Sequence, residues 1–163
     1  MTIREQVLRI LAARDTLVRL RGRVEAGQEP PSRSEAEDDW TPAEILAHVG
    51  EMLPYWLAEI ERVLAGSPEP VPFGRTTADP IRTLTIDRDR TLPTAELYER
   101  LASGVERVSV RLLQLDDRQL ARRALHPTQG EMPVEAIVER FLAGHLEEHA
   151  AQLTARLDRS VEQ

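Results

Sequence analysis

Residues 40–66 read WTPAEILAHVGEMLPYWLAEIERVLAG, and this stretch combines a helix start with a long apolar stripe. Thr41 can cap the first turn, Pro42 suits the first helical position, and Glu44 completes a capping box with Thr41. Apolar residues then recur at helical spacing, namely Ile45, Val49, Met52, Leu53, Trp56, Leu57, Ile60 and Leu64. The stretch therefore predicts one amphipathic helix, which Gly66 ends.

Three further stretches repeat apolar residues every three or four positions, at residues 2–25, 94–115 and 133–159. Strand-like alternation is essentially missing, apart from a weak stretch at residues 82–86. Four amphipathic helices that each bury one stripe are typical of a helical bundle. The sequence therefore predicts an all-α four-helix bundle, formed as a single domain by residues 1–163.

The connection between the second and third predicted helices is long. It covers residues 67–93 and contains five prolines. An extended chain of this length reaches ~90 Å, whereas the third helix is only ~33 Å long. The connection can therefore cross the whole bundle and start the third helix parallel to the second. The other long connection, residues 26–39, is polar and rich in Pro, Asp and Glu.

The composition excludes several kinds of chemistry. The chain has no cysteine, so disulfides, cysteine-ligated zinc and iron–sulfur clusters are excluded. All 21 positive side chains are arginines, so there is no lysine for pyridoxal phosphate or for a P-loop. The net charge of −7 opposes nucleic-acid binding, and no apolar run reaches the ~20 residues of a membrane span. With a charged N-terminus unlike a signal peptide, these features predict a cytoplasmic protein that binds neither nucleic acid nor membrane.

Three of the four histidines lie on the apolar faces of predicted helices. The spacing of His145 and His149 places two imidazoles on one side of a helix, within reach of one ion. His48 lies at a similar depth in the second helix. The three histidines therefore predict a divalent-metal site, and imidazole ligands do not distinguish Zn from Ni or Fe. The alternative is that all three are hydrogen-bonded core residues. His126 is interpreted as a loop residue and not as a fourth ligand.

The histidine pair is not the H-E-x-x-H motif of metalloproteases, because Leu146 follows His145. Glu147 and Glu148 are expected to face solvent or to flank the site. Three neutral ligands leave a coordination position open, which is typical of a catalytic centre. Such a centre would activate water or ionise a thiol, and this cysteine-free chain would take that thiol from solution.

Two blocks of the sequence resemble the DinB/YfiT-like superfamily. Residues 40–48, WTPAEILAH, are similar to its W-S/T-x-x-E-I/L-L-x-H block. Residues 126–132, HPTQGEM, followed by His145, His149 and the pair QL at 152–153, are similar to its C-terminal block. The resemblance implies a four-helix bundle with a long connection between helices two and three.

The resemblance also implies a divalent metal ion held by three histidines, which here are His48, His145 and His149. Characterised members of the superfamily include metal-dependent transferases and isomerases that use low-molecular-weight thiols such as mycothiol, bacillithiol or glutathione. The resemblance therefore implies that the partner of this chain is a small-molecule substrate, with such a thiol as one candidate. Dimers are common in the superfamily, so the resemblance implies a homodimer.

Other residues near the predicted site have two interpretations each. Glu44 either accepts a hydrogen bond from His48 or only caps the helix. Gln152 lies either beside the ring of His149 or on the surface, and Tyr55 either contacts a substrate or only packs. Four arginines of the long connection either cover the pocket, where they bind a substrate carboxylate, or pair with surface acids. They are Arg75, Arg82, Arg88 and Arg90.

Three functions agree with these features. The first is a small-molecule metalloenzyme, either a low-molecular-weight-thiol S-transferase or a metal-dependent hydrolase. The second is a metal-binding or metal-sensing bundle without turnover. The third is a structural helical dimer. No catalytic residue is assigned from the sequence.

Overall fold

The capping box predicted at Thr41 opens helix α3 (Pro42–Ala65). In this computed structural model, which describes residues 1–27 and 37–161, the Thr41 hydroxyl accepts from the Glu44 N–H at 3.3 Å. The Glu44 carboxylate accepts in return from the Thr41 N–H at 2.8 Å. Most of the apolar stripe that follows is buried, while Leu57 and Leu64 are only partly buried. The fully buried residues of this helix are Ile45, Leu46, Val49, Met52, Leu53, Ile60 and Val63.

The other predicted helices form as well, each with a local departure from the prediction. Instead of one helix over residues 2–25, there are two, α1 (Ile3–Arg19) and α2 (Arg21–Gly27), separated at Leu20. The third predicted helix is α5 (Thr94–Leu112). The fourth consists of three consecutive segments, α7 (Val134–Ile137), the π-helical segment η2 (Val138–Gly144) and α8 (His145–Val161). The predicted all-α four-helix bundle is confirmed.

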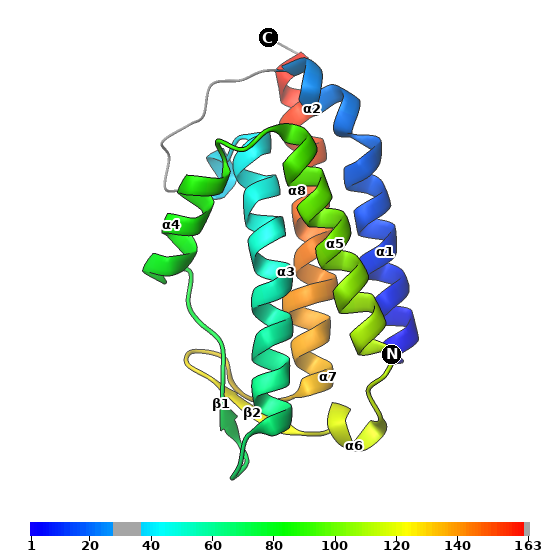
Figure 1. The fold of residues 1–163 in the computed structure, drawn as a ribbon, viewed down its shortest axis with the longest axis vertical. Coiled ribbons are helices and arrows are strands. Elements are labelled where there is room, and N and C mark those ends of the chain that lie inside the picture. The colour runs from blue at the N-terminus through cyan, green and yellow to red at the C-terminus, as the bar shows by residue number, and fades with distance from the viewer. Residues whose placement is uncertain (28–36, 162–163) are drawn as a thin grey trace.

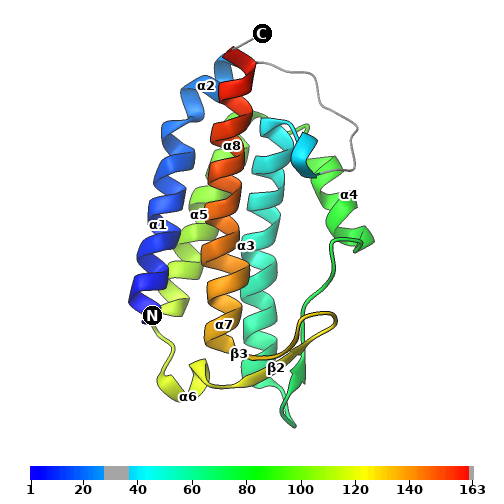
Figure 2. The ribbon, with the colours of Figure 1, turned by 180° about the vertical axis from the view of Figure 1, so that it is seen from behind.

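The bundle has the predicted long crossover. Helices α3 and α5 run in the same direction and lie side by side, while α1 and α8 run the opposite way (Figures 1 and 2). Helix α3 packs against α5 and α8, and α1 packs against the same two helices. The chain between α3 and α5 returns along the outside of the bundle through β1 (Val71–Pro72) and α4 (Pro80–Asp89). Because α8 is antiparallel to α3, the middles of these helices can face each other.

A small three-stranded sheet covers one end of the bundle, and the sequence did not indicate it. Its strand order is β1, β2 (Arg123–His126), β3 (Gly130–Pro133). The short helix α6 (Asp117–Leu120) directly precedes β2 in the chain. Strand β1 pairs in parallel with β2, and β2 pairs antiparallel with β3. Strands of two to four residues are too short to produce a clear alternating pattern.

The weak alternation at residues 82–86 does not form a strand, because these residues lie in helix α4. Asp79 caps that helix by accepting a hydrogen bond from the Arg82 N–H at 2.9 Å. Of the polar connection over residues 26–39, the larger part lies outside the described residues, and its end forms the 3-10 turn η1 (Glu37–Asp39). Within the described residues, no helix has the length and apolar composition that crossing a bilayer requires.

Candidate metal centre

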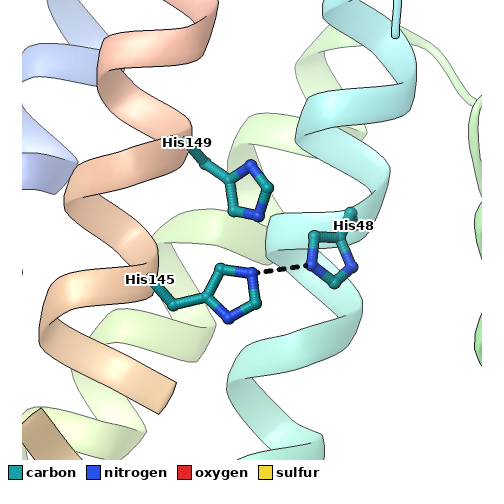
Figure 3. Close-up of side chains that lie close together, drawn as sticks. All are labelled: His48, His145 and His149. Carbon is teal, nitrogen blue, oxygen red and sulfur yellow. Dashed lines mark hydrogen bonds between the residues drawn. The ribbon is translucent and has the colours of Figure 1, made fainter. Parts of the chain in front are cut away.

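Helices α3 and α8 bring three imidazole rings together inside the bundle. His48 projects from α3, while His145 and His149 project from successive turns of α8 (Figure 3). The Nε2 atoms of His48 and His145 are 3.2 Å apart, and one ligand atom of each ring lies within 4.8 Å of the others. Two imidazole nitrogens bound to one tetrahedral ion are ~3.4 Å apart, given Zn–N bonds of ~2.1 Å. The pair formed by His48 and His145 has the spacing of two ligands of one ion, and the nitrogen of the third ring, within 4.8 Å, reaches the same ion after a small side-chain movement.

The π-helical segment η2 directly precedes this site. Its backbone closes on the fifth residue instead of the fourth, so it holds one extra residue in its turn. Gly144 ends η2, and a Cβ there would lie 3.0 Å from the carbonyl oxygen of Glu139, five residues earlier. The extra residue sets the rotation at which His145 begins α8. Segments of this kind are frequent at functional sites.

The environment keeps the three imidazoles neutral. His48 is 1% exposed and His149 is 4% exposed, and burial lowers the pKa of both rings. Burial, reinforced by the neighbouring histidines, lowers the pKa of His145 to about 2. A neutral imidazole has a lone pair to donate to a cation, whereas a protonated one has none. The rings therefore hold the protonation state that a metal ligand needs.

Gln152 fixes the tautomer of His149. Its side-chain oxygen accepts a hydrogen bond from His149 Nδ1 at 2.8 Å, so the proton resides on Nδ1. Its amide nitrogen donates to the Glu37 backbone carbonyl at 2.5 Å. His149 Nε2 is then an acceptor, and it is buried without a hydrogen-bond partner among the described residues. An orphaned acceptor aimed at two other imidazoles fits a cation ligand.

Trp40 closes the other side of the site. Its ring stacks on His149, with centroids 6.1 Å apart, and contacts the edge of His48 at 5.3 Å. The indole is 6% exposed, so it separates the two rings from solvent. Trp40, which directly precedes the cap residue of α3, therefore also covers the imidazole cluster.

A buried ion pair lies behind His48, and sequence reasoning missed it. One carboxylate oxygen of Glu51 lies 3.3 Å from His48 Nδ1, and the other lies 2.5 Å from the Arg75 guanidinium. Both charged side chains are less than one tenth exposed. Burial raises the pKa of Glu51, and the charge of Arg75 opposes that rise. The signal that could have identified Glu51 is its spacing, three residues after His48 on the same helix face.

His126 lies apart from the three-histidine cluster. It is a buried residue at the end of β2, and not the loop residue expected from the sequence. Its Nδ1 accepts from the backbone N–H groups of Thr128 and Gln129, both at 3.2 Å, so Nε2 carries the proton and donates to the Arg75 carbonyl. A Cβ on Gly74 would lie 2.6 Å from the His126 ring, and Gly74 has a φ of +84°. Glycine therefore lets the crossover approach His126.

A cavity of about 790 Å³ opens onto the cluster. His48 and His145 lie on its wall together with the aromatic residues Trp56 and Phe141. Those two aromatic rings stack with centroids 4.3 Å apart. The charged residues of the wall are Glu37, Arg75, Arg82, Arg140 and Glu148. The volume is that of a small-molecule site, and the wall offers both apolar surface and charge.

The structure also places the arginines of the crossover and Tyr55, for which the sequence left two interpretations each. Arg75 and Arg82 line the cavity, whereas Arg88 pairs with Asp89 as a largely exposed side chain. Tyr55 lies under the Arg75 guanidinium, 3.8 Å from ring centroid to Cζ.

Three acids and one arginine complete this comparison. Glu44 keeps its capping role and lies 3.4 Å from a guanidinium nitrogen of Arg90. Glu148 flanks the cavity, as expected, while Glu147 pairs with Arg9.

Sequence and fold comparisons agree on the relatives of this chain. The family model described as the DinB superfamily matches residues 10–153. The fold is similar to that of YfiT from Bacillus subtilis, with a TM-score of 0.73 and 19% identity over 99% of this chain and 90% of that one. YfiT is described as a probable metal-dependent hydrolase with an unusual four-helix bundle topology.

The fold is also similar to two crystal structures of a mycothiol-dependent maleylpyruvate isomerase, one of them a mutant. Each has a TM-score of 0.69 and 15% identity, and the match covers 94% of this chain and 61% of the isomerase. The chain thus spans less than two thirds of the isomerase's length. No match was found among curated proteins.

Proposed function

Since the chain belongs to the DinB superfamily, we propose that it is a small-molecule metalloenzyme that holds a divalent ion between His48, His145 and His149. Its chemistry is either transfer to a low-molecular-weight thiol or hydrolysis. One observation carries this proposal, namely that a cavity of about 790 Å³ opens directly onto the imidazole cluster. A histidine cluster with a structural role alone does not need a cavity of that size beside it.

The protein's residues prepare the site for an ion. Gln152 presents His149 Nε2, and Glu51 lies behind His48 at the ring atom opposite the cluster. An oxygen that accepts from the second ring nitrogen orients a histidine ligand in metal sites, as Gln152 does for His149, whereas the contact between Glu51 and His48 lacks hydrogen-bond geometry. An ion bound by three neutral imidazoles keeps a position free for a substrate and acts as a Lewis acid toward a thiol or a water molecule.

The cavity walls determine what can reach that position. Trp56 and Phe141 present apolar surface, which excludes water from one side of a bound molecule. Arg75 and Arg82 hold the crossover against the site through their pairs with Glu51 and Glu37. The relatives support both chemistries, because one is described as a probable metal-dependent hydrolase and another depends on mycothiol.

Metal analysis of protein purified without a histidine tag tests the first half of the proposal. We expect one divalent ion per chain in the wild type and none in His145→Ala. His126→Gln is the matched control, because it changes a buried histidine of the same cavity that lies outside the cluster. Loss of the ion in the control and not in His145→Ala would contradict the assignment of ligands.

Turnover assays test the second half. The metal-loaded protein is incubated with an electrophile and one thiol together, and thiol consumption is followed. Separate reactions use mycothiol, bacillithiol and glutathione. A second assay omits the thiol and follows ester hydrolysis. A rate no greater than that of the free ion in both assays would leave a metal-binding bundle without turnover, the second function considered from the sequence. We propose in addition that residues 1–163 form one domain and that the protein is a cytoplasmic homodimer.

A further inference from the structure

The charges on the cavity wall are unequally neutralised. Arg75 is paired with Glu51 at 2.5 Å, and Arg82 is paired with Glu37. Both arginine side chains are less than one tenth exposed, so each is held in place by its carboxylate. These two guanidinium groups are therefore already neutralised by the protein itself.

Arg140 is the exception among the arginines of the wall. Its Nη1 donates to the side-chain oxygen of Gln129, which is a neutral amide. Among residues 1–27 and 37–161, no carboxylate lies within ion-pair distance of Arg140. The rest of its guanidinium fork remains available to a ligand, and the hydrogen bond to Gln129 holds the fork in place.

The π-helical segment η2 brings Arg140 to the same wall as the imidazole cluster. Arg140 and Phe141 lie within η2, and His145 follows directly after it. Arg140 and His145 are five residues apart, which is about one turn of such a segment. Both residues, with Phe141 between them in the sequence, line the cavity. This wall therefore presents the unpaired guanidinium of Arg140, the ring of Phe141 and the imidazole of His145.

Glu148 limits the charge that this wall accepts. It also lines the cavity, and it is an exposed carboxylate, three residues after His145. Arg140 compensates one negative charge of a ligand, whereas a second charge would meet no other unpaired arginine among the described residues of this wall and would be repelled by Glu148. The arrangement therefore favours a monoanion over a phosphate dianion.

We propose that the cavity binds a small organic monocarboxylate, whose carboxylate group lies on Arg140 and whose apolar body lies against Phe141 and Trp56. The far end of such a molecule then points to His48 and His145. That this far end is the reacting end rests on the proposed function, whereas the binding of the carboxylate by Arg140 does not. The proposal thus names the substrate class of the site as small carboxylic acids with an apolar or aromatic body.

Calorimetric titration of the chelator-treated, metal-free protein tests this proposal, because a carboxylate cannot ligate an ion that has been removed. Benzoate is the probe, benzamide is its neutral isostere, and phenyl phosphate is the dianionic comparison. We expect benzoate to bind, and benzamide and phenyl phosphate to bind at least about tenfold more weakly. Benzamide lacks the charge-assisted bidentate pair, which is worth more than about 1.4 kcal/mol. Phenyl phosphate carries a second negative charge that no unpaired arginine among the described residues of the wall compensates.

Two arginine variants complete the experiment. Arg140→Gln is expected to weaken benzoate binding at least about tenfold and to leave benzamide unchanged. Arg118→Gln removes the same charge from the exposed surface of α6 and is expected to leave both affinities unchanged. Arg140 is itself exposed, and the melting curve by circular dichroism checks that the variant folds.

Three results would overturn the proposal. They are equal affinity of the wild type and Arg140→Gln for benzoate, equal affinity of the wild type for benzoate and benzamide, and tighter binding of phenyl phosphate. Because these titrations use metal-free protein, they are separate from the metal analysis and the turnover assays. A protein without bound metal or turnover but with benzoate binding that depends on Arg140 would refute only the proposed function.

Discussion

Gln152 is a single neutral side chain that connects α8 to the turn before α3. It accepts from His149 Nδ1 at 2.8 Å and donates to the Glu37 carbonyl at 2.5 Å. The first contact sets the tautomer of the ring, and the second holds the amide in the orientation that makes the first possible. The order of the imidazole cluster therefore depends on a residue that is not itself a ligand.

Replacement of Gln152 is expected to weaken metal binding without removing a ligand. In Gln152→Leu, His149 loses the acceptor that holds its proton on Nδ1, and the affinity for Zn²⁺ should fall about 10–100-fold. Gln152→Glu retains an acceptor for Nδ1 but loses the donor to the Glu37 carbonyl, so it should recover only part of the affinity. Competition with a chromophoric chelator measures both. Equal losses in the two variants would show that Gln152 acts through packing alone.

The buried histidines also give the metal-free protein a pH-dependent stability. Burial lowers the pKa of His48, His145 and His149 in the folded state, so below the unfolded value of about 6.5 the unfolded chain binds more protons. The contribution of these histidines to the free energy of unfolding is therefore fully present above that pH, and it is lost as the pH decreases through it. Each histidine contributes a slope of up to about 1.4 kcal/mol per pH unit.

Urea unfolding of chelator-treated protein between pH 7.5 and 5.5 measures this slope. The His145→Gln variant should lose one histidine's share of it, because Gln does not titrate. Glu51 acts in the opposite direction, since burial raises its pKa, but it is present in both proteins and its contribution largely cancels in the comparison. Identical slopes in the wild type and the variant would show that His145 is protonated in the folded state.

At this scale the sequence identifies what lies on a helix face and little else. His48, His145 and His149 could be selected because each lies on an apolar stripe, and the structure brings their rings together. That they bind a metal stays a prediction. Glu51 lies on the same face as His48 and was open to the same argument, but Arg75 comes from the crossover, whose path no local pattern determines. Gln152 had two interpretations, and the structure shows its contact with His149.

Among the elements, η2 has the most direct effect on the site. Its extra residue changes the rotation of α8 relative to α7, and Gly144 allows the tight approach of the Glu139 carbonyl. That carbonyl belongs to a packed helix and has little room to move. Arg140, within this segment, and His145, directly after it, both line the cavity. The π segment thus links helix geometry to the composition of the cavity.

Gly144→Ala is expected to destabilise the protein by about 1–3 kcal/mol, because its Cβ would press on a backbone carbonyl. Gly22→Ala is the matched control. It also lies in a helix, but a Cβ there meets nothing within 4 Å, so alanine should stabilise by about 0.5–1 kcal/mol. Urea unfolding measures both changes. A Gly144→Ala variant as stable as the wild type would show that the π turn adjusts without cost.

Sequence patterns predicted the long helices correctly and did not predict the short elements. The long periodic stretches became α1, α3, α5 and α8, and the capping box fixed the start of α3 at Pro42. The π segment η2 was not predicted, because one extra residue in a turn barely changes an apolar period. Strand β2 alternates in burial but covers four residues, which is too few to recognise. In α4, the cap at Asp79 outweighed the alternation that suggested a strand.

For the whole molecule, the main question is what holds the crossover to the bundle. Between α3 and α5 the chain contacts the bundle through β1, through α4 and through the pair formed by Arg75 and Glu51. That pair is buried, and a buried charge without its partner costs much more than an exposed one. The crossover forms one wall of the cavity, so its attachment also decides whether the cavity keeps its shape.

A double-mutant cycle measures that attachment. Arg75→Met leaves Glu51 charged and buried without its partner and should cost about 3–5 kcal/mol of unfolding free energy. Adding Glu51→Gln removes the stranded charge, so the double variant should be more stable than Arg75→Met alone. The matched control is the surface pair of Arg123 and Glu131, whose side chains are 44% and 46% exposed, and where Arg123→Met should cost less than about 1 kcal/mol. If Arg75→Met costs no more than this control, the ion pair does not hold the crossover, and packing of β1 and α4 accounts for its position.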